Sequence, residues 1–186
     1  MNIELDLITA CINRERRAEY ELYKLTYSYL MSICIRYTNN KEEAEEILNT
    51  GFLKILNNLT KYRTEIPFKV WMRKVMINVL IDSYRKEKTR NEQIKYVENY
   101  IETSDFADVN NALVKMNTEQ IYRLIKQLPP MSQKVFNLYA IDGFAHKEIA
   151  EMLDMSEGTS KWHLSFSRQQ LKEMIAKMVS SKTTVS

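Results

Sequence analysis

The chain has few of the residues that build sheets and tight turns. Its 186 residues include three glycines and three prolines, and its apolar residues recur at helical rather than alternating spacing. Sandwiches and barrels consist of many short strands joined by turns that are rich in glycine and proline. The sequence therefore excludes such folds and predicts an all-α protein.

Reactive and metal-binding side chains are also scarce. The two cysteines, Cys11 and Cys34, lack metal-ligand spacing and are too few for a disulfide framework. Both lie among apolar residues, which indicates buried, reduced thiols. His146 and His163 are the two histidines, and no glycine-rich phosphate loop is present. Neither an enzyme nor a bound metal or cofactor is predicted.

Long apolar runs are missing as well. No stretch is long and apolar enough to span a membrane, and the acidic N-terminus lacks a signal-peptide pattern. We therefore expect a cytoplasmic protein without membrane insertion. The formal net charge of +3 is too small to indicate a nucleic-acid partner by itself. Its distribution is more informative, because a cation-rich segment at 69–90 follows a glutamate cluster at 42–46.

The apolar pattern predicts helices throughout, with a linker between two domains. Helical patterning runs over 4–37 with a break near Asn13, and Asn40 is expected to cap a helix over 42–58. Another helix begins near Pro67 and continues to about 88. Further helices are expected at 118–128 and, capped by Ser132, up to about 141. The predicted organisation is a first domain at 1–90, a polar linker at 91–117, a second domain at 118–179 and a disordered tail at 180–186.

Residues 145–171 read as two short helices joined by a tight turn, with Ser156 as the cap of the second helix. On a helical wheel, one face of the second helix is small or apolar and suited to packing: Ser160, Leu164, Ser167 and Leu171. The opposite face carries Trp162, Ser165, Phe166 and Gln169, with Lys161 and Arg168 on one flank.

Two large aromatic residues on the outer face of a helix indicate a contact surface, and the helix-turn-helix pattern favours DNA as the partner. His163 is expected to flank this DNA-facing side. In the alternative interpretation, Trp162 and Phe166 pack against another helix of the same domain.

The helix expected at 68–86 is apolar on almost every side. One narrow stripe differs, and it consists of Trp71, Lys74, Asn78, Asp82 and Arg85. Such a stripe supplies a stacking surface, an amide that can bond a base edge, and cations for phosphates. In the alternative interpretation it is a solvated stripe on a buried helix.

The preceding helix has an apolar face for packing and a second face suited to a protein contact. The second face is polar except for an exposed leucine at its centre. It comprises Glu43, Glu46, Asn49, Thr50, Leu53 and Asn57.

Taken in order, these segments resemble a sigma factor of the extracytoplasmic-function class of the sigma-70 family. The acidic helix at 43–56 resembles region 2.2, and the segment 68–73, leading into Asn78 and Asp82, resembles regions 2.3 and 2.4. The matches to region 4 are the segments 128–130, 141–144, 148–153 and 156–161. The order of these pieces is more specific than any one of them.

The resemblance implies two helical domains on a flexible connector that threads toward the RNA-exit channel of the polymerase. The first domain would bind the clamp helices of core RNA polymerase through Glu43, Glu46, Asn49, Thr50 and Leu53. It would also open the minus-ten element of promoter DNA, with a base flipped into a pocket of the loop at 61–67. The residues that would contact this element are Arg63, Trp71, Lys74, Asn78, Asp82 and Arg85.

The second domain would place its last helix in the major groove of the minus-thirty-five element. The matching positions are Thr159, Lys161, Trp162, Ser165, Phe166 and Arg168. The resemblance also implies an anti-sigma factor as a partner.

Several positions depart from the family pattern. The family usually has Asp at 43 and 46, Gln at 49 and Glu at 50. It often has Arg at 163 and 166, and basic residues at 169 and 170. The last helix is therefore less cationic than in the family, which predicts weaker salt dependence and more apolar contact with T-rich DNA.

Two other functions fit parts of the sequence. One is a transcription regulator that uses the helix-turn-helix and never joins polymerase, with a sensor or dimerisation domain at its N-terminus. The 43–82 region argues against it, because a simple regulator needs no open stripe preceded by an acidic helix. The other is a helical adaptor in which Trp162 and Phe166 anchor a partner protein.

Overall fold

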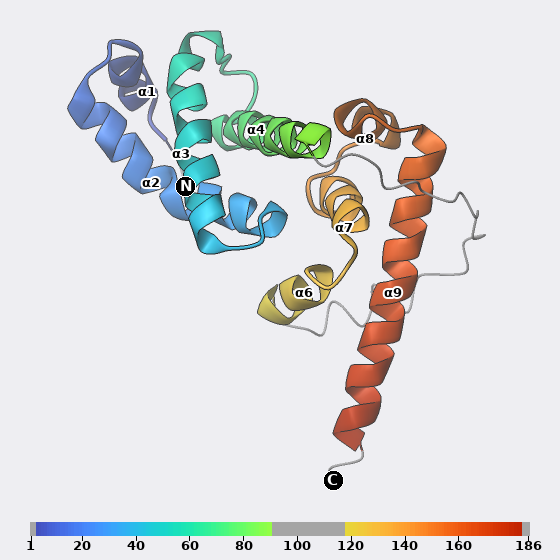
Figure 1. The fold of residues 1–186 in the computed structure, drawn as a ribbon. Helices are drawn as coiled ribbons and strands as arrows, with labels where there is room; N and C mark the ends of the chain where they lie inside the picture. Colours follow the sequence, from blue (N-terminus) through green and yellow to red (C-terminus); the bar gives the residue numbers. More distant parts are fainter. Residues whose placement is uncertain (1–2, 91–117, 184–186) are drawn as a thin grey trace. The chain divides into compact units, whose positions relative to one another are not determined.

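The computed structural model of the chain describes residues 3–90 and 118–183 (Figure 1). Within these ranges the regular structure is entirely helical, which confirms the all-α prediction. The chain divides into two compact units, unit 1 at 1–92 and unit 2 at 93–186. The linker predicted at 91–117 lies outside the described residues. Among the described helices, none has the length and apolar character needed to cross a membrane.

The described part of unit 1, residues 3–90, consists of four helices and one short 3₁₀ turn. These elements are α1 (Leu5–Ile12), α2 (Arg16–Tyr37), α3 (Lys41–Asn57), η1 (Leu59–Lys61) and α4 (Phe68–Arg90). Helices α2, α3 and α4 pack against one another, and α1 packs against α2 (Figure 1). The predicted break near Asn13 is confirmed, since Arg14 takes a positive φ of 61° between α1 and α2.

The cap of α3 is also confirmed. Asn40 Oδ1 accepts a hydrogen bond of 2.8 Å from the backbone N–H of Glu43. The Glu43 carboxylate in turn accepts one of 3.0 Å from the backbone N–H of Asn39. These bonds satisfy two N–H groups that the start of a helix otherwise leaves unpaired.

The core of unit 1 is apolar and tightly packed. Leu48, Met72 and Met76 are fully buried between α2, α3 and α4. Helices α3 and α4 approach closely at Gly51, where an added Cβ would lie 2.5 Å from the sulfur of Met76. The prediction for Cys11 and Cys34 is confirmed: both thiols are free and buried. Burial raises the pKa of Cys11 to about 11 and that of Cys34 to about 12, so both stay protonated at neutral pH.

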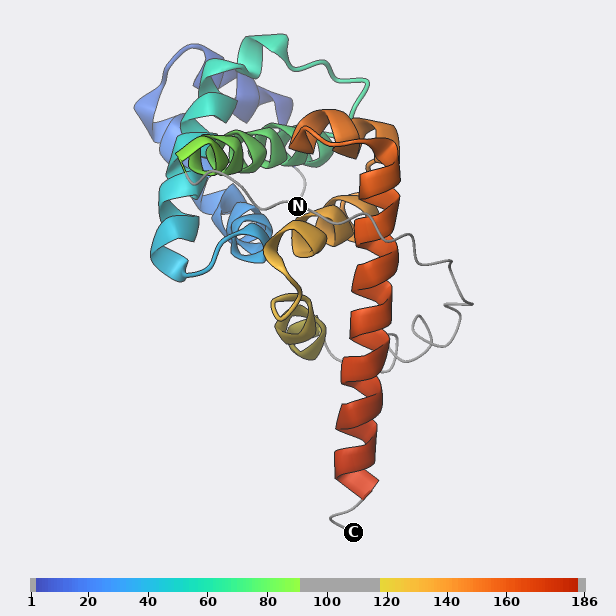
Figure 2. The ribbon, with the colours of Figure 1, turned by 45° about the vertical axis from the view of Figure 1, so that its right-hand side comes forward.

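Unit 2 arranges shorter helices along one long helix. Its described elements are α6 (Thr118–Ile125), α7 (Pro130–Phe136), the π-helical turn η2 (Asn137–Ile141), α8 (His146–Leu153) and α9 (Glu157–Thr183). Helices α6, α7 and α8 all contact α9 (Figure 2). Together α8 and α9 form the predicted helix-turn-helix, with Asp154 in the left-handed region (φ 53°) at the turn.

Two predicted boundaries in unit 2 are wrong. Ser132 does not cap a helix: α7 begins at Pro130, with Pro129 at the N-cap, because a proline fits the first helical position, where no N–H bond is needed. The tail predicted from Ser180 also begins too early, because α9 continues to Thr183. Residues 184–186 lie outside the described residues.

Candidate nucleic-acid interface

The predicted stripe on α4 lies on the accessible side of that helix. We call Trp71, Lys74, Asn78, Asp82 and Arg85 the α4 seam. Trp71 is half-buried, and the other four residues are exposed. Met72, Met76, Ile77 and Leu80, on other sides of α4, are all buried. Val70, outside the seam, is 48 % exposed, so α4 is less completely packed than its apolar sequence predicts.

Trp71 is held by two other aromatic rings. Phe68, which is buried, stacks on it with ring centroids 5.6 Å apart and an interplanar angle of 22°. Tyr62, from the loop before α4, lies tilted against Trp71 at 5.4 Å and edge-on to Phe68 at 5.0 Å. The indole therefore has a fixed orientation, while part of its surface stays accessible for stacking.

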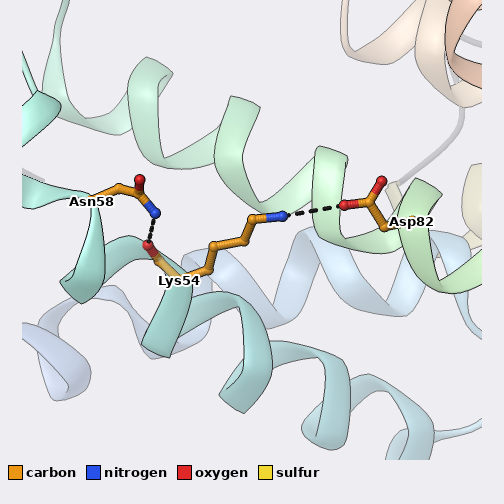
Figure 3. A network of polar contacts seen from close by, with 3 residues as sticks. All are labelled: Lys54, Asn58 and Asp82. Atoms are coloured by element: carbon orange, nitrogen blue, oxygen red, sulfur yellow. Dashed lines mark hydrogen bonds and ion pairs between the residues drawn. The ribbon is translucent and has the colours of Figure 1, made fainter.

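Asp82, the single carboxylate of the seam, is paired. Its Oδ2 lies 3.2 Å from Nζ of Lys54, which extends across from α3 (Figure 3). Nδ2 of Asn58 donates a 2.7 Å hydrogen bond to the backbone carbonyl of Lys54. The side chains of Lys54 and Asp82 are about half exposed. Lys54 thus offsets the negative charge that Asp82 places among the other four residues of the seam.

A hollow lies between the polar face of α3 and the seam. The hollow has a volume of about 330 Å³ and lies between α3 and α4; its polar lining is Glu43, Glu46, Thr50, Lys54, Asp82, Ser83 and Lys86. Leu53 is 60 % exposed, as predicted. Asn49 is exposed, and its Oδ1 accepts a 3.0 Å hydrogen bond from the hydroxyl of Tyr23.

Arg63 lies in the loop between η1 and α4, outside the seam. Every residue from 63 to 67 is exposed.

In unit 2 the predicted inner face of α9 is confirmed. Ser160, Leu164, Ser167 and Leu171 are all buried. The Ser156 cap is confirmed as well, because its Oγ accepts a 2.9 Å hydrogen bond from the backbone N–H of Thr159.

The outer face of α9 has a stacked aromatic pair. Trp162 and Phe166 are half-buried, with ring centroids 5.2 Å apart and planes within 14°. Lys161 is exposed and Thr159 is half-buried. The guanidinium of Arg168 lies 5.9 Å from the centroid of the Tyr139 ring. The pair is thus neither sealed inside unit 2 nor fully solvated.

Ser165 and His163 are placed differently from the prediction. Ser165 is 7 % exposed rather than open to solvent. Its side chain is short, and Trp162 and Gln169, one turn before and after it, are much larger. His163 is 1 % exposed and does not flank an open surface. Its Nδ1 lies 2.9 Å from Oγ of Ser132, across the α7–α9 contact.

His163 belongs to a buried polar network that sequence patterns did not reveal. The hydroxyl of Ser167 donates to the backbone carbonyls of Ser132, at 3.0 Å, and of His163, at 2.7 Å. Burial lowers the pKa of His163 to about 4, so its ring is neutral at pH 7. The network joins α7 to the inner side of α9.

A second histidine joins α8 to α9. His146 Nδ1 lies 2.9 Å from Oγ of Ser160, and its ring stacks on Tyr139 with centroids 4.5 Å apart. Burial, followed by the nearby charge of Lys161, lowers the pKa of His146. Within residues 3–90 and 118–183, no group of three or more His, Cys, Asp or Glu side chains could hold a metal ion.

Comparison with known proteins assigns the two units to two regions of one family. Residues 22–90 match the model of Sigma-70 region 2, and residues 118–171 match that of Sigma-70, region 4. The α4 seam lies in the first match, and the stacked pair of α9 lies in the second.

Curated relatives carry the same family description. The chain is 23 % identical over 165 residues to the RNA polymerase sigma factor YlaC of Bacillus subtilis, covering 88 % of this chain and 95 % of that protein. It is 26 % identical over 154 residues to the ECF RNA polymerase sigma factor SigW of the same species, covering 78 % and 82 %.

A solved structure shares the fold. It is the sigma factor RpoE of Bartonella quintana, crystallised with the anti-sigma factor NepR. The TM-score is 0.50 at 16 % identity, with 85 % of this chain and 96 % of that chain covered.

Proposed function

Because the chain belongs to the extracytoplasmic-function class of the sigma-70 family, we propose that it binds core RNA polymerase and directs promoter-specific transcription initiation. One observation carries the proposal. Each unit matches one sigma region, in the family order, and within each match a helix that is packed on its other sides presents accessible aromatic and cationic side chains. Such a protein works in the cytoplasm, where the polymerase is.

We assign the minus-ten element to the α4 seam together with Arg63. Flipping a base out of a duplex costs a few kcal/mol, and stacking a base on an aromatic side chain returns about 1–3 kcal/mol. Trp71 offers the stacking surface, and Asn78 offers an amide for a base edge. Lys74, Arg85 and Arg63 supply positive charge for the backbone, with Asp82 already paired to Lys54.

We assign the minus-thirty-five element to the outer face of α9. The edges of Trp162 and Phe166 suit thymine methyls in a major groove, and Lys161 reaches guanine or phosphate. Thr159 and Arg168 complete the proposed contact. Ser165 is left out because it is buried. Few cations take part, so the salt dependence of this contact is expected to be weak.

We assign the polymerase contact to the polar face of α3. Leu53, at 60 % exposure, is its apolar centre, and apolar residues ringed by polar ones are typical of protein interfaces. Glu43, Glu46, Asn49 and Thr50 surround it. Asn49 is oriented by its bond with Tyr23, and Glu43 by its bond with the Asn39 amide.

An anti-sigma factor is a further proposed partner. The B. quintana sigma factor was crystallised with such a protein, and this chain shares its fold. The exposed apolar residues of unit 1, among them Leu53, would be covered in such a complex.

Transcription by a reconstituted enzyme tests the proposal. The purified chain would be added to core RNA polymerase from the organism that encodes it, with genomic DNA as template, and transcript starts would be mapped by sequencing. We expect a limited set of start sites that share two upstream sequence elements. Transcripts no different from those of core polymerase alone would contradict the proposal.

A matched pair of variants controls for the polymerase contact. Leu53→Lys should abolish the specific starts by placing a charge at the centre of the proposed interface. Leu25→Lys changes a leucine on α2 that is also about half exposed, and it should leave them intact. Equal effects of the two substitutions would contradict the assignment of α3.

A further inference from the structure

The loop between η1 and α4 has one residue that points back into unit 1. Residues 63–67 are all exposed, whereas Tyr62 is half-buried. Its backbone N–H donates to Leu59 O at 3.0 Å and so ends η1. The loop therefore begins at a side chain that contacts the body of the unit, and the residues after it extend into solvent.

The hydroxyl of Tyr62 closes this loop. It donates a 2.9 Å hydrogen bond to the backbone carbonyl of Ile66, four residues ahead. Within the loop, the backbone N–H of Ile66 also donates to Arg63 O, at the longer distance of 3.3 Å. Pro67, which follows, has no N–H to donate. The hydrogen bond from the Tyr62 hydroxyl is thus the shorter of the two bonds that link residues of this exposed segment.

The ring of Tyr62 connects the loop to the α4 seam. It lies edge-on to Phe68 at 5.0 Å and tilted against Trp71 at 5.4 Å. Phe68 is buried and also stacks on Trp71. One side chain therefore touches the aromatic residue of the seam through its ring and fixes the backbone of the loop through its hydroxyl.

We propose that Tyr62 is a positioning residue that holds the 61–67 loop and Trp71 in one fixed relation, and so sets which base is accepted at the minus-ten element. The inference rests on the proposed function. Tyr62 itself need not touch DNA, because its hydroxyl is engaged by Ile66 and its ring by Phe68 and Trp71. Without the hydrogen bond from Tyr62 to Ile66, the loop would have to become ordered each time a base binds. The conformational entropy lost in that ordering weakens binding.

The test separates the hydroxyl from the ring. Reconstituted polymerase would transcribe a promoter library randomised across the minus-ten element, and the transcribed sequences would be counted. Loss of one ordinary hydrogen bond corresponds to a change of roughly twofold to tenfold. Tyr62→Phe should therefore weaken the preference at one minus-ten position by about that factor, with the minus-thirty-five preference and the melting temperature unchanged. Tyr62→Ala should weaken the preference further.

A spectroscopic measurement follows the ring contact independently. The chain has two tryptophans, Trp71 and Trp162, so a Trp162→Phe background leaves Trp71 as the only one. In that background Tyr62→Ala should shift Trp71 emission to the red and increase its quenching by acrylamide, because one side of the indole becomes solvated. Tyr62→Phe keeps the ring and should change neither.

Tyr20→Phe is the matched control. Tyr20 lies on α2 and is 63 % exposed, so removal of its hydroxyl should alter neither base preference nor stability. If the wild-type protein directs specific transcription and Tyr62→Phe keeps the full base preference, the proposed role of Tyr62 is overturned, while the proposed function stands. A uniform loss on all sequences that parallels a lower melting temperature also overturns it, since that would indicate a merely structural role. Wild-type protein that directs no specific transcription overturns the proposed function and this inference together.

Discussion

In unit 1, helix α4 packs against its neighbours mainly through buried apolar side chains, whereas in unit 2, helix α9 is joined to its neighbours partly through buried polar side chains. The buried threonines of unit 1 are Thr26 in α2 and Thr38 at the C-cap of α2, and both donate to carbonyls of α2, at 2.8 and 3.0 Å. The bonds of Ser132 with His163 and of His146 with Ser160 instead cross between helices.

This difference affects how each helix can respond to change. Apolar packing is strong but tolerates small rotations and swaps of similar volume. Hydrogen bonds across an interface fix one orientation, and they leave a costly unpaired group when one partner is lost. We therefore expect the core shared by α3 and α4 to be sensitive to lost volume, and the contacts of α9 to be sensitive to the protonation of His146 and His163.

The largest expected effect is a cavity in unit 1. Leu48→Ala removes a fully buried side chain from α3, which should lower the free energy of unfolding by about 2–5 kcal/mol. Urea denaturation followed by Trp71 fluorescence in the Trp162→Phe background measures it. Leu53→Ala, on the same helix but 60 % exposed, should cost about 0.5 kcal/mol or less. Similar costs for the two would contradict the core assigned to unit 1.

Acid should destabilise unit 2 through His163. Its pKa is lowered from an ordinary 6.5 to about 4 by burial, so between these values the unfolded chain binds a proton that the folded unit does not. The contribution of His163 to stability is complete above pH 6.5 and is lost as pH falls toward 4, by about 3 kcal/mol in total. His146, whose pKa is also lowered, acts in the same direction.

Denaturation curves at pH 7 and pH 5 check this prediction in the full chain. Trp162 fluorescence in a Trp71→Phe background follows unit 2, and Trp71 in the Trp162→Phe background follows unit 1. His163→Gln should flatten the pH dependence of unit 2 without removing it, because His146 remains. A pH dependence of unit 2 that is unchanged in His163→Gln would show that the buried ring is not its source.

A smaller effect is expected at the start of α9. Ser156→Ala removes the hydroxyl that accepts from the Thr159 amide at 2.9 Å, and loss of such a cap costs about 1 kcal/mol. Hydrogen–deuterium exchange should show faster exchange of the first turn of α9. Ser28→Ala, an exposed position inside α2, is the control and should leave exchange of α9 unchanged. Equal protection of the first turn in wild type and Ser156→Ala would count against the cap.

The smallest effect on stability is expected at the pair of Lys54 and Asp82. Both side chains are about half exposed, and pairs of this kind contribute about 1 kcal/mol or less. Asp82→Asn should thus barely change unfolding, yet it removes a negative charge from the seam and releases Lys54. Affinity for single-stranded DNA should rise in Asp82→Asn and fall in Lys54→Met. Opposite changes would mean that Asp82 makes a favourable DNA contact of its own.

Local features of both units could be predicted from the sequence. The caps at Asn40 and Ser156 depend on residues within one helical turn, and the inner face of α9 follows from its periodicity. Pairings between distant residues could not be predicted in this way. Ser132 has the character of a helix cap, but it lies inside α7, and its side chain instead bonds His163, 31 residues further along the chain.

In the candidate interface, too, local features could be predicted from the sequence and contacts between distant residues could not. The α4 seam and the pair of Trp162 and Phe166 follow from helical spacing. The pairing of Asp82 with Lys54, 28 residues away, and the bracing of Trp71 by Tyr62 depend on how helices and loops meet. The burial of Ser165 could not be predicted either. A helical wheel places a residue on a face, but it does not show how far larger neighbouring side chains cover that residue.

We expect the two surfaces of this chain, the α4 seam and the outer face of α9, to have different tasks on one promoter. Permanganate footprinting of polymerase carrying Trp71→Ala or Trp162→Ala tests it most directly, because permanganate oxidises thymines only where the duplex is open. Polymerase with Trp71→Ala should bind the promoter but leave minus-ten thymines unreactive, whereas polymerase with Trp162→Ala should bind more weakly but open the DNA once bound. Promoter binding that is unchanged in Trp162→Ala, or thymines that react normally in Trp71→Ala, would contradict it.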